Sequence, residues 1–145
     1  MLVSNTKIIL ADDDIEDVVF FEDVLTELSF MGLLITVNSG QHLMETLLLS
    51  TYKPNIIFID YNMPNKNGLE CLKEIKGNDL IKDTPVIMMS GIASGDLIDD
   101  MYNAGAHFFL QKPSTPEQLK EKVKRIISAF LNFNPPIPSR NSFCI

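Results

Sequence analysis

Four short apolar runs in this chain each end at, or next to, an acidic, hydroxyl or amine side chain. Runs of this length, bounded by turn signals, are typical of buried strands in a parallel sheet. They are residues 8–11, followed by Asp12, Asp13 and Asp14; 56–59, followed by Asp60; 86–89, followed by Ser90; and 108–111, followed by Lys112. Because the carboxyl ends of parallel strands meet at the edge where such sheets bind ligands, we expect these side chains to share one site.

Segments with helical periodicity separate these runs, and a further apolar run lies at residues 33–37. A strand followed by a helix, repeated five times, is typical of an α/β fold with right-handed crossovers. The sequence therefore predicts a doubly wound, five-stranded parallel sheet with strand order 2-1-3-4-5. The switch point of that order lies between the first and third strands, which end at the acidic run and at Asp60.

Length and composition limit the class of protein. With 145 residues, 46% of them apolar, the chain can form one core. We expect a domain over 1–131 and a Pro-rich tail over 132–145. The net charge of −7 argues against direct nucleic-acid binding, and no apolar run could span a membrane. Cys71 and Cys144 form no disulfide framework, and the first seven residues lack a signal-peptide pattern, so a cytoplasmic location is expected.

The acidic residues at this edge favour a metal site. At about 4 Å and an effective dielectric of about 20, each pair of carboxylates repels by roughly 4 kcal/mol, which a bound cation would relieve. Oxygen donors with no nearby His or Cys favour Mg²⁺, with Mn²⁺ as the alternative. The run 12–14 alone is equally typical of a helix N-terminus. Asp60 on the neighbouring strand makes the metal site the stronger interpretation.

A loop with turn residues follows Asp60, and with it the pattern resembles a known family. In chain order the matching features are Asp12-Asp13, Asp60-x-x-Met-Pro64-x-x-x-Gly68, Ser90 and Lys112-Pro113. Together they resemble the receiver domain of bacterial two-component response regulators, over about residues 7 to 130. The resemblance implies a flavodoxin-like (βα)5 fold of the single-domain, chemotaxis-regulator-like type.

The resemblance also implies roles for the acidic residues. Asp60 corresponds to the phosphoacceptor aspartate. Asp13, Asp60 and the backbone carbonyl of Asn62 correspond to direct Mg²⁺ ligands, and Asp12 acts mainly through water. Pro64 and Gly68 shape the loop that follows the phosphoacceptor.

Further roles fall on the last two strands. Ser90 corresponds to the switch hydroxyl and Lys112 to the lysine that pairs with the phosphoryl group. Phe109 falls at the switch aromatic position, and we expect it to turn inward on phosphorylation. The bond from Lys112 to Pro113 is usually cis in the family. Gly91 stands where Ala is frequent, which should leave the site more open.

The function implied is Mg²⁺-dependent phosphoryl transfer from a histidine kinase or His-phosphotransfer protein to Asp60. The added charge would switch a protein-interaction surface formed by the fourth helix, fifth strand and fifth helix. Such a domain is not an enzyme, apart from at most slow self-dephosphorylation. The resemblance implies no membrane partner, leaves the downstream target unspecified, and leaves both a monomer and a homodimer open.

Two other functions would use some of the same residues. An aspartyl phosphatase of the haloacid dehalogenase type would use Asp12-x-Asp14, Ser90 and Lys112. That interpretation leaves the loop after Asp60 unexplained, and no acidic pair follows a strand after Lys112. The second alternative is a receiver that binds partners without phosphorylation, and the complete set of motif residues argues against it.

Overall fold

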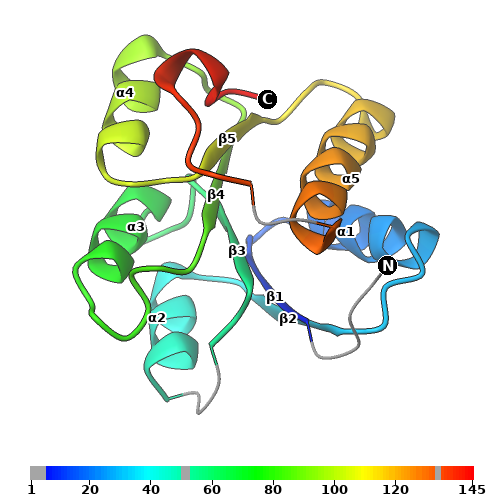
Figure 1. Ribbon diagram of the computed structural model, residues 1–145, viewed down its shortest axis with the longest axis horizontal. Helices are drawn as coiled ribbons and strands as arrows, with labels where there is room; N and C mark the ends of the chain where they lie inside the picture. Colours follow the sequence, from blue (N-terminus) through cyan, green and yellow to red (C-terminus); the bar gives the residue numbers. More distant parts are fainter. Residues whose placement is uncertain (1–5, 50–52, 133–134) are drawn as a thin grey trace.

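Strands and helices alternate along the whole chain (Figure 1). The computed structural model describes residues 6–49, 53–132 and 135–145, so the expected domain 1–131 and tail 132–145 each include residues outside this part. The elements are β1 Lys7–Ala11, α1 Ile15–Glu27, β2 Leu33–Val37, α2 Gly40–Leu49, β3 Ile56–Asp60, α3 Gly68–Lys76, β4 Val86–Ser90, α4 Gly95–Asn103, β5 Phe108–Gln111, α5 Pro116–Asn132 and the 3-10 helix η1 Arg140–Ser142.

The five strands form one parallel sheet in the order β2-β1-β3-β4-β5, which confirms the predicted topology. The register aligns the carboxyl ends of the central strands. Ala11 pairs with Ile59, Asp60 with Met89, and Ser90 with Gln111. The residues that follow these strands therefore emerge at a single edge.

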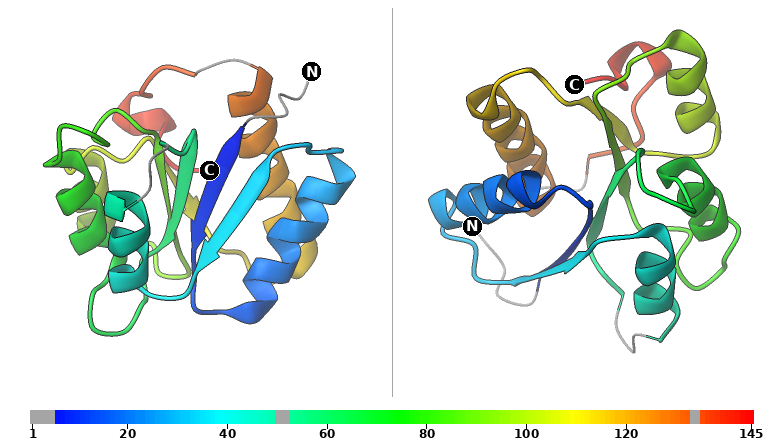
Figure 2. Two further views of the ribbon diagram at one scale, coloured as in Figure 1. Left: turned by 90° about the horizontal axis from the view of Figure 1, so that it is seen from below. Right: turned by 180° about the vertical axis from the view of Figure 1, so that it is seen from behind.

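Helices cover both faces of the sheet, with α1 and α5 on one face and α2, α3 and α4 on the other (Figures 1 and 2). Successive strand side chains point to opposite faces. Ile8 and Leu10 pack with α1 and α5, whereas Ile9 and Ala11 pack with the other three helices. Both faces are thus buried, which explains why the strands are continuous apolar runs.

The end of the chain returns to the sheet. Residues 135–145 lie beside α4 and β5, where Figure 1 shows them in red. Phe109 of β5 and Cys144 form an isolated parallel bridge. Residues 135–139 are not helical, whereas Arg140–Ser142 form the short helix η1, and the segment packs against the domain. None of the described helices is long and apolar enough to cross a membrane.

Candidate functional site

Three carboxylates meet at the carboxyl edge of the sheet. Asp12 and Asp13 follow β1 and Asp60 ends β3. One oxygen from each lies within 4.8 Å of the others. Asp12 and Asp60 are buried, whereas Asp13 is exposed. Oxygen-only donors that carry mutually repelling charges fit a hard divalent cation, so these residues are suited to hold one.

Lys112, directly after β5, supplies the positive charge of this site. Its Nζ lies 3.1 Å from Asp12 Oδ2 and 3.2 Å from Asp60 Oδ1. A shorter bond, 2.6 Å, joins it to Asp17 Oδ2. The amine therefore reaches the carboxylates from β5 across β4 and β3, as the strand ends predicted, and it also contacts α1.

Burial and the nearby charges shift the pKa values of Asp12, Asp60 and Lys112. Burial raises the pKa of Asp12 to about 7, although Lys112 acts in the opposite direction. It also raises the pKa of Asp60, again against Lys112. Burial acts to lower the pKa of Lys112, but the hydrogen bond to Asp17 and the nearby carboxylate charges outweigh it and raise the pKa. Lys112 thus stays charged, while Asp12 and Asp60 hold a proton more tightly than exposed carboxyl groups do.

The loop between β3 and α3 holds Asp60 in place. The Tyr61 N–H donates to the Met89 carbonyl of β4 at 2.7 Å, and the Gly68 N–H donates to the Tyr61 carbonyl at 2.9 Å. A Cβ at Gly68 would lie 2.6 Å from the carbonyl oxygen of Asp60, so a side chain there would push the loop away. Asn62 lies in the site, but ligation of a metal by its carbonyl stays a prediction.

Ser90 ends β4 next to Asp60 and is fully buried. Its Oγ accepts from the N–H of Ile92 at 3.0 Å, and its carbonyl accepts from the N–H of Lys112 at 2.9 Å. Nothing lies within 4 Å of a Cβ built at Gly91, in line with the open site expected there. Ser90 therefore connects the loop before α4 to the segment that carries Lys112.

Two expectations for the β5 region need correction. Phe109 is already 1% exposed, in an apolar cluster with Met101 and Phe143, so it has no outward position from which to turn inward. The Lys112–Pro113 bond is trans, because the described residues contain no cis peptide bond. Trans is the ordinary form of an X–Pro bond, and Lys112 reaches all three of its carboxylates in that form.

Sequence reasoning missed Asp17. This residue lies in the first turn of α1 and is buried on the same helix face as Phe21 and Val24. The sequence did contain a signal, because Asp17 lies four residues before Phe21 and so falls on the apolar face of the helix. Asp14, by contrast, caps α1, since its carboxylate accepts from the N–H of Glu16 at 2.9 Å. The carboxylate of Asp14 is therefore used by the helix, which argues against the Asp12-x-Asp14 pair of the phosphatase alternative.

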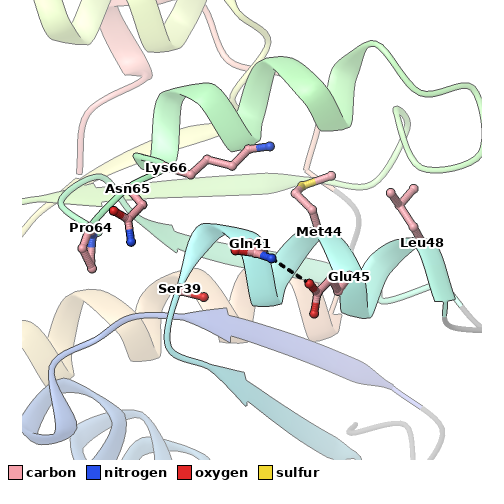
Figure 3. A pocket seen from close by; sticks show the side chains of 8 residues that line it. All are labelled: Ser39, Gln41, Met44, Glu45, Leu48, Pro64, Asn65 and Lys66. Carbon is pink, nitrogen blue, oxygen red and sulfur yellow. Dashed lines mark hydrogen bonds between the residues drawn. The ribbon is translucent and has the colours of Figure 1, made fainter.

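Two hollows lie around α2, and they differ in their distance from the site. The first opens beside the carboxylates and is lined by Asp12, Asp13, Ile15, Val18, Thr36, Val37, Asn38 and His42. The second lies between α2 and the β3–α3 loop, and Figure 3 shows Met44, Pro64 and Lys66 among its lining residues. There Gln41 bonds to Glu45, and Lys66 pairs with Glu74 outside the hollow. Only the first hollow therefore adjoins the carboxylate cluster.

The comparisons agree with this geometry. Residues 8–124 match the response regulator receiver domain. The chain is similar to the chemotaxis protein CheY-3 of Vibrio cholerae, with 29% identity over 126 residues, covering 87% of this chain and 95% of the relative. It is similar in structure to the phosphorylated cyanobacterial phytochrome response regulator RcpA, with 28% identity and a TM-score of 0.84 over 93% of this chain and 99% of that one.

A second solved structure bears on the metal. The Mn²⁺-bound form of the response regulator Rcp1 has 27% identity and a TM-score of 0.84, over 92% of this chain and 99% of that one. A parallel sheet of this order, with carboxylates, a hydroxyl and an amine at one edge, is the architecture of a receiver domain. The chain belongs to the response regulator receiver domain family. Domains of this type act in two-component signalling, where they interact with histidine kinases and downstream targets, and they are not enzymes in the usual sense.

Proposed function

We propose that Asp60 accepts a phosphoryl group, in a Mg²⁺-dependent reaction, from a histidine kinase or His-phosphotransfer protein. The observation that supports this most directly is the convergence of Asp12, Asp13, Asp60 and Lys112 at one edge. Asp60 is the member of the group that ends a strand and has its own loop. The first hollow opens beside Asp12 and Asp13, so a donor side chain could approach the cluster from there.

The transfer is a displacement at phosphorus. A carboxylate oxygen of Asp60 bonds to phosphorus while the P–N bond of the donor phosphohistidine breaks, and the leaving imidazole keeps the electron pair and takes up a proton. A Mg²⁺ ion held by Asp12, Asp13 and Asp60 would neutralise charge on the phosphoryl oxygens. Lys112 Nζ, 3.2 Å from Asp60, is placed to pair with the same oxygens.

The product acyl phosphate carries about −1.5 to −2 charges where the carboxylate carried −1. Ser90 can donate to one new oxygen and Lys112 can pair with another. Both residues connect to the α4–β5 side of the domain, so the charge change would switch a protein-interaction surface there. The same proposal places the protein in the cytoplasm and allows it at most slow self-dephosphorylation. It specifies neither the downstream target nor whether the protein is a monomer or a homodimer.

Intact-mass measurement after incubation with acetyl phosphate and Mg²⁺ tests the proposal. Wild type should gain the mass of one phosphoryl group, and Asp60→Asn should gain none. Asp23→Asn, an exposed acidic residue on α1, is the matched control and should react like wild type. A label that persists in Asp60→Asn would overturn the assignment of the phosphoacceptor.

A further inference from the structure

The shortest of the three ion pairs of Lys112 is made to a residue outside the cation cluster. Lys112 Nζ lies 2.6 Å from Asp17, compared with 3.1 Å from Asp12 and 3.2 Å from Asp60. Asp17 is 8% exposed. Among the described residues, the acidic side chains that could together hold a metal are Asp12, Asp13 and Asp60, and Asp17 is not one of them.

This difference matters because Lys112 and a cation would share two carboxylates, Asp12 and Asp60. A buried carboxylate needs a partner. Asp12 and Asp60 would gain a second positively charged partner when a cation binds, whereas Asp17, outside the cluster, pairs with Lys112. Asp17 can therefore keep Lys112 at the edge of the site while the other two carboxylates turn to the metal.

We propose that Asp17 is a positioning residue, which holds the Lys112 amine beside Asp60 and keeps it from competing with the cation for Asp12 and Asp60. This inference rests on the proposed function of the site. Without Asp17, Lys112 would pair only with Asp12 and Asp60, the carboxylates that would also bind the metal. The amine then loses the contact with α1 that fixes its direction.

Mg²⁺ titration by calorimetry tests the first half of this role. Asp17→Asn keeps the size of the side chain but removes its charge, and we expect it to weaken Mg²⁺ binding by about tenfold, within the range of couplings between contacting groups. The Asn side chain can still hydrogen-bond to Lys112, whereas Ala cannot. Asp17→Ala should therefore weaken Mg²⁺ binding at least as much as Asp17→Asn does. Glu16→Gln, exposed in the same helix turn, removes an equal charge without touching Lys112 and should change binding by less than about twofold.

A double-mutant cycle separates positioning from a structural role. In a Lys112→Met background, Asp17→Asn should weaken Mg²⁺ binding no more than Glu16→Gln does, because no amine is left to compete. Equal weakening in both backgrounds would overturn the inference. Thermal unfolding of each variant verifies that the fold is kept.

Phosphorylation tests the second half. At saturating Mg²⁺, Asp17→Asn should react with acetyl phosphate several-fold more slowly than wild type, because Lys112 is less well directed. An unchanged rate would overturn this part of the inference. If wild type takes up no phosphoryl group, or takes it up at a residue other than Asp60, the proposed function itself fails, while the Mg²⁺ cycle still decides whether Asp17 positions Lys112.

Discussion

The backbone N–H of Phe109 donates to the carbonyl of Phe143 at 2.9 Å, and the N–H of Ile145 donates back to the carbonyl of Phe109 at 2.8 Å. Residues 143–145 thus lie along the outer edge of β5, on the side opposite β4 (Figure 2). Phe143 is fully buried and packs edge-on against Tyr102 of α4. The surface on which we expect the response to phosphorylation is therefore partly covered by the chain itself.

Further contacts hold this segment in place. Arg140 pairs with Asp99 of α4 at 2.8 Å, and the Tyr102 hydroxyl donates to the Pro138 carbonyl at 3.3 Å. His107 Nε2 lies 2.9 Å from the carbonyl oxygen of Pro135. A sheet edge that is paired in this way is protected from pairing with other chains.

Phe143→Ala should detach the segment. Truncating a buried Phe costs about 3 kcal/mol or more, but the loss of unfolding free energy is limited to the contribution of the docked segment, which can separate while the rest stays folded. Amide exchange should accelerate at Phe109 and Ile145. Asn141→Ala, an exposed position two residues earlier, is the control. If exchange at β5 were unchanged, the segment would not depend on the Phe143 contact.

The features that could be predicted from the sequence are those that depend on local patterns. The strands, their order and the convergence of Asp12, Asp60 and Lys112 follow from apolar runs and the polar residues at their ends, which are adjacent in the sequence. The role of Asp17 depends on how α1 is rotated about its axis relative to the strand ends. Hydrophobic periodicity places Asp17 on the buried face of α1, but it does not show which residue Asp17 contacts there. The docking of Phe143 depends on partners distant in the sequence, in α4 and β5, and the nearby prolines predicted only a Pro-rich tail.

Asp13→Ala should remove metal binding and phosphorylation together. Asp13 is exposed and belongs to the carboxylate cluster, so its loss removes a ligand while leaving the core intact. Calorimetry should detect Mg²⁺ binding weakened by at least about tenfold, with thermal stability unchanged or higher.

Asp14→Ala is the matched comparison for that variant. It removes the cap of α1 and should lower the unfolding free energy by about 1 kcal/mol with Mg²⁺ binding kept. If Asp13→Ala bound Mg²⁺ as wild type does, residues 12–14 would be no more than a helix start.

The raised pKa of Asp12 predicts a pH dependence of stability. Burial raises this pKa from 3.8 to about 7, so the folded protein holds the proton more tightly than the unfolded chain does. The contribution of Asp12 to the unfolding free energy is therefore greatest below its ordinary pKa, and it declines as the pH rises towards 7. Without added metal, wild type should lose thermal stability relative to Asp12→Asn as the pH rises from about 4 to 7, with little further loss above that. A difference between the two proteins that does not change with pH would contradict the assignment.

The final prediction concerns the response to phosphorylation. Beryllofluoride, a mimic of the phosphoryl group, should change amide exchange most over residues 90–112, because Ser90 and Lys112 can both turn to the new oxygens. Movement of Ser90 would weaken the bond that its Oγ accepts from Ile92, and the change at Lys112 would pass into β5. Since Phe109 is bonded to Phe143 and Ile145, the change should extend to residues 135–145, with Phe109 itself staying buried. Asp60→Asn treated in the same way should show no such change. If the largest change fell in α1 or α2 instead, the coupling between Asp60 and the α4–β5 side would be wrong.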